Sequence, residues 1–351
     1  MAESDLKQKA ENVWPSLSIC VIARNEETAL PDLLRSILEQ SYPHSAIQLL
    51  LIDSCSDDST KQLMLSFKNE HGKVFSEVLV LDNPGIRQAN GWNVALEKVS
   101  CELVMRLDAH SEIPSDYIER CVSWIRKGEA ICGGKVLNLP GSDSSEAILA
   151  NIAENSLFGG SIASFRHAET PKYVSTLAFA VYRADVFDAV GPFDTRLART
   201  EDNEIHYRMR NAGYKFFYDP SIVSFRKTRS TVRGLIEQKY LNGFWIGMTL
   251  YVSPHCFSIY HFVPAAFVAA LIVSTLSALL WSVVPLVTLC VLYLVAIITM
   301  AVASALVEEH NKALCIWLPV VFLLLHLAYG IGTIAGLIRG FVSKHFTHDS
   351  V

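Results

Sequence analysis

Residues 17–25 read Leu-Ser-Ile-Cys-Val-Ile-Ala-Arg-Asn (LSICVIARN), an apolar run with β-branched members that ends in polar residues. Such a run is typical of a buried strand. Similar apolar runs follow at 47–52, 77–81 and 103–107. Segments with apolar residues at helical spacing separate them, at 29–39, 60–69 and 86–99. Strands that alternate with helices predict an α/β fold with a mainly parallel sheet and helices on both faces.

The pattern loosens between about 130 and 225. Short strands are predicted at 130–136, 175–182 and 215–218, together with a helix at 202–211. We therefore expect a parallel α/β half followed by a mixed half.

Two carboxylates directly follow predicted strands: Asp53 after 47–52 and Asp108 after 103–107. Open α/β sheets bind their ligands at the carboxyl ends of strands, so both positions predict a binding site. Asp53 can accept hydrogen bonds from a base or ribose, and the Ser/Asp-rich turn after it offers amides suited to phosphate. Asp57 and Asp58 in that turn are equally well explained as helix-capping residues.

Asp108-Ala-His110 places two metal-capable side chains on the same side of an extended chain. Mg²⁺ takes few protein ligands and completes its shell with substrate phosphate oxygens, whereas Mn²⁺ tolerates imidazole better. Such an ion would neutralise the charge on a departing nucleoside diphosphate. A strand-end turn with a solvated histidine would give the same pattern.

Glu201 and Asp202 stand at the start of the helix predicted at 202–211. Acidic residues in a first helical turn are favoured by the helix dipole, which is one explanation. The other is that Asp202 is a general base, a carboxylate that takes a proton from an attacking group. The residues alone leave both explanations open.

Two long stretches lack Asp, Glu, Lys and Arg, from 240 to 307 and from 313 to 338. A bilayer-spanning helix needs about 20 mostly apolar residues. We predict three spans, at 259–281, 285–307 and 314–338. Buried core helices are the alternative, but three such runs in succession are hard to bury in a soluble domain.

Basic residues precede the first predicted span: Arg226, Lys227, Arg229, Arg233 and Lys239. They favour the cytoplasmic side and predict a cytoplasmic globular domain. Three spans would place the tail, with its own basic residues, on the opposite side. A fourth insertion at 240–254 would correct this, but its glycines and proline favour an interfacial or re-entrant helix.

The chain has 351 residues and a net charge of −5. The N-terminus (MAESDLKQKAENVWP) has no apolar core and does not resemble a signal peptide. The eight cysteines show no CxxC spacing, so we expect reduced packing residues and neither a disulfide framework nor a zinc site. The predicted organisation is an N-terminal polar segment, a catalytic domain, juxtamembrane helices, a membrane domain and a tail, at 1–16, 17–225, 226–257, 258–340 and 341–351.

Four motifs in this order and spacing, ICVIARNEE, LLIDSCSDDST, RLDAH and TEDNEIHYRMRNAGYKFFYDP, resemble glycosyltransferase family 2. The Asp-Ala-His variant is most similar to the ExoA-like succinoglycan branch of bacterial exopolysaccharide glucosyltransferases. The resemblance covers about residues 17–250 and the membrane tail. It implies a GT-A fold, which is a Rossmann-like mixed sheet flanked by helices, and an inverting mechanism.

The resemblance also implies roles for individual residues. The nucleotide pocket would be lined by Ala23, Arg24 and Glu26. Asp53 would bind the uracil of a UDP-sugar, and Asn93 would help to hold the donor. Asp108 and His110 would bind Mn²⁺ or Mg²⁺ with the donor diphosphate, and Asp202 would be the catalytic base with Glu201 beside it. Gln238 and Trp245 stand where processive members carry Gln-x-x-Arg-Trp, but that Arg-Trp pair is missing here, which argues against processive polymer synthesis.

The implied activity is the transfer of one sugar, such as glucose from UDP-glucose, to a polyprenyl-linked acceptor in exopolysaccharide or cell-surface glycan synthesis. An alternative acceptor is polyprenyl phosphate itself, and an alternative from another class is a non-catalytic membrane scaffold of a glycan assembly complex. The expected location is the bacterial inner membrane, with multi-pass topology. Membrane lipids are expected partners, and nucleic acid is not.

Overall fold

The computed structural model describes residues 14–160 and 168–346. Most of the predicted N-terminal segment 1–16 and the end of the predicted tail 341–351 lie outside these residues. The described chain divides into two compact units. The first comprises residues up to 137, 167–196 and 208–226, and the second comprises 138–166, 197–207 and the chain from 227 onward. The domain boundaries expected from the sequence remain a prediction.

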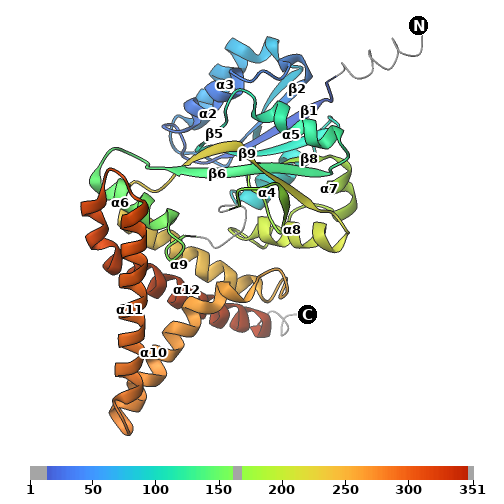
Figure 1. Ribbon diagram of the computed structural model, residues 1–351. Coiled ribbons are helices and arrows are strands. Elements are labelled where there is room, and N and C mark those ends of the chain that lie inside the picture. Colours follow the sequence, from blue (N-terminus) through green and yellow to red (C-terminus); the bar gives the residue numbers. More distant parts are fainter. Residues whose placement is uncertain (1–13, 161–167, 347–351) are drawn as a thin grey trace. The chain divides into compact units, whose positions relative to one another are not determined.

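A nine-stranded sheet in the order β3-β2-β1-β4-β8-β6-β9-β5, with β7 paired to β9, organises the first part of the chain (Figure 1). Its strands are β1 (Leu17–Ala23), β2 (Ile47–Asp53), β3 (Glu77–Asp82), β4 (Leu103–Asp108), β5 (Ser111–Glu112), β6 (Ile131–Leu139), β7 (Lys172–Val174), β8 (Val181–Arg183) and β9 (Phe216–Lys227). Strands β1 to β4 pair in parallel, and the later pairings are antiparallel. This mixed sheet confirms the predicted α/β class and its division into a parallel and a mixed half.

Helices cover both faces of the parallel half. On one face, Ile19 and Val21 of β1 share a core with the apolar sides of three helices. These are α2 (Leu30–Leu38), α3 (Thr60–His71) and α5 (Tyr117–Arg126). On the other face, α4 (Gln88–Leu96) approaches so closely that a Cβ on Gly91 would lie 2.8 Å from Ile22. The period-two alternation of β1 side chains explains this division.

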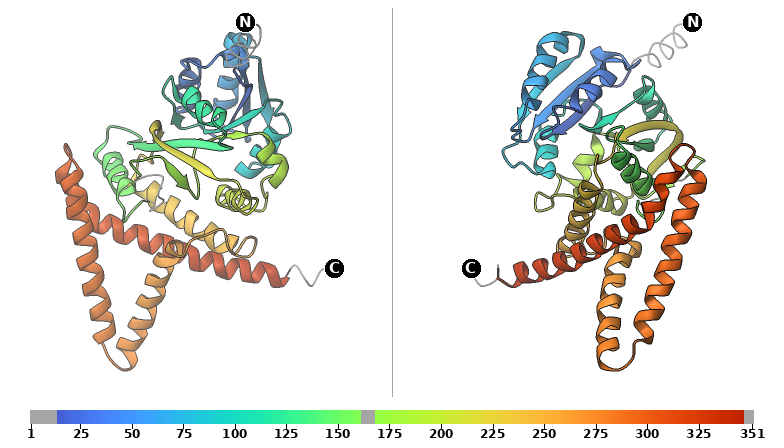
Figure 2. Two further views of the ribbon diagram at one scale, coloured as in Figure 1. Left: turned by 45° about the vertical axis from the view of Figure 1, so that its right-hand side comes forward. Right: turned by 90° about the vertical axis from the view of Figure 1, so that its left-hand side faces the viewer.

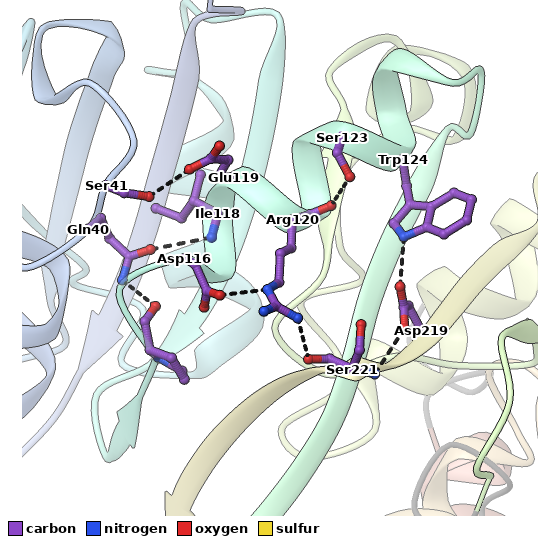
Figure 3. Close-up of polar contacts among 11 residues, drawn as sticks. Gln40, Ser41, Asp116, Ile118, Glu119, Arg120, Ser123, Trp124, Asp219 and Ser221 are labelled. Atoms are coloured by element: carbon purple, nitrogen blue, oxygen red, sulfur yellow. Dashed lines mark hydrogen bonds and ion pairs between the residues drawn. The ribbon is translucent and has the colours of Figure 1, made fainter.

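Polar contacts fasten α5 to β9 and to the end of α2 (Figure 3). Trp124 Nε1 donates to the Asp219 carboxylate at 2.8 Å, and Arg120 donates to the Ser221 carbonyl at 3.0 Å. On the other side, the Gln40 carbonyl accepts from the first turn of α5. Hydrogen bonds to a charged carboxylate are among the stronger ones, so this network ties the mixed half to the parallel half of the sheet.

The predicted strand at 175–182 is wrong for residues 175–180 and holds only for 181–182, which belong to β8. The structure has β7 and β8 instead, and residues 175–180 between them are irregular. Phe179 has φ +54°, a left-handed conformation that no strand accommodates. For the same reason the predicted helix at 86–99 begins later, because Ile86 has φ +62°.

Three helices of the later half have no counterpart in the predicted pattern: α5, α6 (Ser145–Asn155) and α7 (Asp185–Val190). The α6 helix begins at a conventional cap, because Ser144 Oγ accepts from the Ala147 amide at 3.1 Å. The helix predicted at 202–211 is present as α8 (Glu201–Asn211).

The second unit contains four long helices: α9 (Val232–Thr249), α10 (Val263–Leu280), α11 (Val284–Val307) and α12 (Leu318–Phe346). Three segments of the described chain are long and apolar enough to cross a membrane, namely Ile259–Leu280, Val284–Val307 and Lys312–Ser343. They match the three predicted spans to within a few residues. The α9 helix, which contains much of the segment considered for a fourth insertion, is not among them.

Helices α9 and α12 lie side by side (Figure 2). A Cβ on Gly243 would collide with the Tyr329 carbonyl, and one on Gly247 would lie 2.6 Å from the Leu337 amide. From α12, a Cβ on Gly336 would collide with the backbone of Phe244. Glycine is therefore required on both helices for their backbones to approach, as in tightly packed membrane helices.

Candidate active site

Asp53 and Asp108 lie at the same edge of the sheet in the first unit. Their strands, β2 and β4, flank β1 in parallel, with Ala23 aligned to Asp53 and Ile22 aligned to Asp108. Because parallel strands end at one edge, the predicted position of both carboxylates at strand ends is confirmed. Ala23 itself is buried, and its neighbour Arg24 is exposed.

Asp53 is buried, and both of its carboxylate oxygens lie near the Ser56 amide, at 3.3 and 3.4 Å. The turn that follows is joined to the end of β1 by reciprocal bonds: Asn25 donates to Ser56 Oγ at 3.1 Å and accepts from the Asp57 amide at 2.8 Å. Cys55 in this turn has φ +56°. The turn is therefore a fixed loop that holds Asp53 in place beside the end of β1.

Asp58 has the capping role that the sequence left open. Its carboxylate accepts from the Thr60 amide at 3.0 Å and from the Glu27 amide at 3.1 Å. These bonds outweigh the effect of desolvation and lower the pKa of Asp58. The bonds that Asp53 accepts from the Ser56 amide are longer, at 3.3 and 3.4 Å.

Glu26 and His110 lie together in the first unit. His110 Nδ1 is 3.3 Å from Glu26 Oε1, and the Asp108 side chain accepts from Gln88 Nε2 at 3.5 Å. Burial disfavours the imidazolium, but the hydrogen bond to Glu26 and the charge of Asp108 outweigh it and raise the pKa of His110. The structure thus brings together three of the residues implied for the donor site: Glu26, Asp108 and His110.

Residues 14–160 and 168–346 contain no group of three or more His, Cys, Asp or Glu side chains arranged to hold a metal ion. One carboxylate and one imidazole, from Asp108 and His110, would leave most ligand positions of a divalent ion to other groups, such as substrate phosphate oxygens.

Asn93 occupies a structural position. Its side chain donates to the Phe193 carbonyl at 2.9 Å and accepts from the Phe193 amide at 2.8 Å. Both ends of the carboxamide are thereby anchored to the Phe193 backbone, with one N–H and one lone pair left over. The implied role of Asn93 in holding the donor gains no support from these contacts.

Glu201 and Asp202 belong to the second unit, at the start of α8. Glu201 is buried, whereas Asp202 is half-buried and accepts from the Asn203 amide at 2.7 Å. Just before them, Arg199 donates to Asn242 Oδ1 at 3.2 Å, and the Thr200 hydroxyl lies 2.6 Å from that of Thr249. These two bonds hold the segment with the candidate base against α9.

Gln238 and Trp245 are both on α9, half-buried. The Gln238 side-chain carbonyl accepts from Arg229 Nε at 3.2 Å, and the Trp245 carbonyl accepts from the Thr249 hydroxyl at 2.6 Å. Sequence reasoning missed the polar residues beside them, Arg199, Asn242 and Thr249. The one available signal was the Arg-Thr pair immediately before Glu201.

Residues 18–191 match the family model described as Glycosyl transferase family 2. The chain is 25% identical over 330 residues to the dolichyl N-acetyl-alpha-D-glucosaminyl phosphate 3-beta-D-2,3-diacetamido-2,3-dideoxy-beta-D-glucuronosyltransferase of Methanococcus voltae, which covers 92% of this chain and 98% of that protein. It is 26% identical over 201 residues to the succinoglycan biosynthesis protein ExoA of Rhizobium meliloti, which covers 57% of this chain and 59% of ExoA.

The fold is also similar to that of a solved structure, the mannosyltransferase PcManGT from Pyrobaculum calidifontis in complex with GDP-Man and Mn²⁺. The TM-score is 0.56 at 16% identity, over 95% of this chain and 89% of that chain. This likeness supports the GT-A-like architecture. Residues 18–191 therefore form a glycosyltransferase family 2 domain, and the chain is a glycosyltransferase.

Proposed function

We propose that this glycosyltransferase moves one sugar from a UDP-sugar, with UDP-glucose as the first donor to test, to a lipid-linked acceptor in the membrane. The observation that carries the proposal is the position of Asp53 and Asp108 at the ends of the two strands that flank β1 in a family 2 domain. The relative from Methanococcus voltae is named for a dolichyl-linked sugar phosphate, which supports a polyprenyl-type acceptor.

In the proposed donor site, Asp53 accepts hydrogen bonds from the base, as its buried carboxylate at a strand end allows. Arg24 and Glu26 follow β1 at the same sheet edge. Asp108 and His110 would hold Mn²⁺ or Mg²⁺ together with the donor diphosphate. When bound, the ion neutralises the charge of the leaving nucleoside diphosphate.

Asp202 is proposed as the base of an inverting transfer. Its carboxylate takes the proton of the acceptor hydroxyl while the hydroxyl oxygen forms a bond to the anomeric carbon. The bond between that carbon and the diphosphate oxygen breaks, and UDP leaves with the bonding electrons. Glu201 beside it is buried at the start of α8. An α-linked donor would then give a β-linked product.

We further propose a multi-pass protein of the plasma membrane with the catalytic domain on the cytoplasmic side. Support comes from the three apolar helices and from the basic residues around 226–239 that precede them.

The test is UDP or GDP release by the detergent-purified protein with a panel of UDP- and GDP-sugars, with and without Mn²⁺ and a lipid extract. We expect release from one UDP-sugar, stimulation by lipid, loss in EDTA and recovery on adding Mn²⁺ or Mg²⁺. Full activity in EDTA would contradict the metal role of Asp108 and His110.

Asp202→Asn should lower transfer by about 10²–10⁴-fold, the usual contribution of a general base, with UDP binding retained. Asp188→Asn is the matched control, because Asp188 is an exposed carboxylate on α7. Unchanged transfer in Asp202→Asn would refute the base assignment. The mobility of the lipid product separates a monosaccharide phospholipid from an extended lipid oligosaccharide, and so decides between polyprenyl phosphate and a lipid-linked sugar as acceptor.

A further inference from the structure

Two arginines of the second unit, Arg199 and Arg229, are held next to each other on one face of α9. Arg199 Nη1 donates to Asn242 Oδ1 and Arg229 Nε donates to Gln238 Oε1, each at 3.2 Å. Gln238 and Asn242 are four residues apart in a helix, which places their Cβ atoms about 5–6 Å from each other. We call Arg199 and Arg229 the arginine pair.

The partners of the arginine pair do not neutralise it. Both acceptors are neutral amides, and within the described ranges neither arginine forms an ion pair with a carboxylate. Burial and the charge of Arg229 lower the pKa of Arg199, and buried Glu201 only partly offsets them. Among the described residues, no anion neutralises the two guanidinium charges together.

The hydrogen-bonding geometry of the arginine pair favours one kind of anion, a phosphate or a diphosphate. A guanidinium presents parallel N–H groups that match phosphate oxygens, and two of them converge best on a phosphate or a diphosphate. The position of α9 points to a lipid source. Its first turns expose Arg233 and Glu237, with side chains 89% and 62% exposed, and charges so exposed are costly in hydrocarbon. The first turns of α9 therefore lie outside the hydrocarbon. The candidate span Ile259–Leu280 follows α9 directly in the chain, which keeps α9 close to the membrane surface, where lipid phosphates are found.

We propose that the arginine pair binds the phosphate or diphosphate of the lipid-linked acceptor, an inference that rests on the transferase function proposed above. Arg199 precedes Asp202 by three residues in a segment fixed to α9 by the Arg199–Asn242 and Thr200–Thr249 bonds. The acceptor headgroup is thereby held by the same segment that carries the candidate base.

The test uses the full-length protein in phosphatidylcholine nanodiscs titrated with farnesyl diphosphate, and separately with UDP, by calorimetry. The variants are Arg199→Gln, Arg229→Gln and the double change. The matched control is Arg233→Gln, which removes an exposed arginine of the same helix. Each single change should weaken farnesyl diphosphate binding about tenfold and the double change more, since a hydrogen bond to a charged group is lost. UDP binding and the control should be unchanged.

Equal farnesyl diphosphate binding by the double variant and the wild type would refute the proposal, and so would the absence of binding by the wild type. Equal weakening of UDP binding would assign the pair to the donor. If phosphatidylglycerol in the nanodiscs abolishes farnesyl diphosphate binding, the arginine pair binds bulk lipid headgroups instead of the acceptor. Arg199→Lys and the thermal midpoint of each variant control for misfolding. UDP release from UDP-sugars, measured in parallel, tests the transferase function independently.

The packing of α12 on α9 carries a second inference. The contacts run in register along both helices, from Tyr240 beside Gly332 to Tyr251 beside Gly340. The α12 helix therefore shares the depth of α9, whose first turns expose charges. We infer that α12 lies along the membrane surface and that only α10 and α11 cross, which places the C-terminal tail on the same side as α9. This arrangement also satisfies the positive-inside tendency for Arg339.

The check is a reporter fusion after Val351, compared with one after Leu280 at the end of α10. We expect green fluorescent protein to be bright at the C-terminus and alkaline phosphatase to be active after Leu280. Active alkaline phosphatase at the C-terminus would show three crossings and overturn the inference.

Discussion

The Thr249 hydroxyl joins the segment before α8 to α9. Thr249 Oγ1 donates to the Trp245 carbonyl at 2.6 Å, and Thr200 Oγ1 lies 2.6 Å from it. A hydroxyl has a single hydrogen, so Thr200 must donate to Thr249. Thr249 and Thr200 are 0% and 3% exposed, so water does not replace this bond.

Thr249→Val keeps the shape of the side chain and removes the acceptor. The Thr200 hydroxyl is then buried without its partner, which costs about 1–3 kcal/mol. At roughly 2–4 °C per kcal/mol for a unit of this size, the thermal midpoint should fall by several degrees. Because Thr200 is two residues before Asp202, we also expect kcat for sugar transfer to fall while UDP affinity stays unchanged.

The assay combines thermal unfolding of the detergent-purified protein with the rate of UDP release. Thr249→Ser should recover both, because serine restores the hydroxyl. A Thr249→Val protein with wild-type stability and turnover would show that this bond neither stabilises the segment nor positions Asp202.

Three further predictions concern stability. Gly247→Ala should lower the thermal midpoint, because the new Cβ would meet the backbone of α12 and overpacking typically costs about 1–3 kcal/mol. The control Gly72→Ala should leave the midpoint unchanged, because the atoms nearest to its Cβ lie at 3.7–4.0 Å. Asn93→Ala should destabilise the protein by leaving both backbone groups of Phe193 unpaired, and intact stability with weakened donor binding would instead support a donor role. For Asp219, burial raises the pKa, but hydrogen bonds from Ser221 and Trp124 outweigh it and lower the pKa in the folded protein. Because the pKa is lowered, ionised Asp219 stabilises the fold above about pH 4, and this stabilisation is lost as the pH falls through the pKa of the folded protein. The unfolding midpoints of wild type and Asp219→Asn should therefore converge in acid. A difference between the two midpoints that persists in acid would refute the assignment.

The parallel half of the fold was predictable because its signals are local. A buried strand has a continuous apolar run, and the helices between the strands carry apolar residues at helical spacing. The end of each run then places Asp53 and Asp108 at the sheet edge without further information. The mixed half was less predictable, since Phe179 interrupts a run that otherwise reads as one strand, and its left-handed φ leaves no mark on apolar periodicity.

The second unit shows the limit of reading along the chain. Three apolar helices followed from length and charge alone, because long apolar runs with few charges are visible in consecutive residues. That residues 197–207 join this unit could not be foreseen, since it depends on contacts such as Thr200–Thr249, which are 49 residues apart.

Consecutive residues were enough to indicate the family, the α/β order of the first half, the acids at its strand ends and the three apolar helices. Each of these features is visible in consecutive residues, as a buried apolar run, an alternation of strands and helices, or a long apolar stretch. Which polar side chains meet became apparent from the packing of the elements. The arginine pair, the pairing of Glu26 with His110 and the glycine contacts between α9 and α12 all join residues from separate elements. Their geometry depends on how helices and strands pack, which the order of residues along one element does not specify.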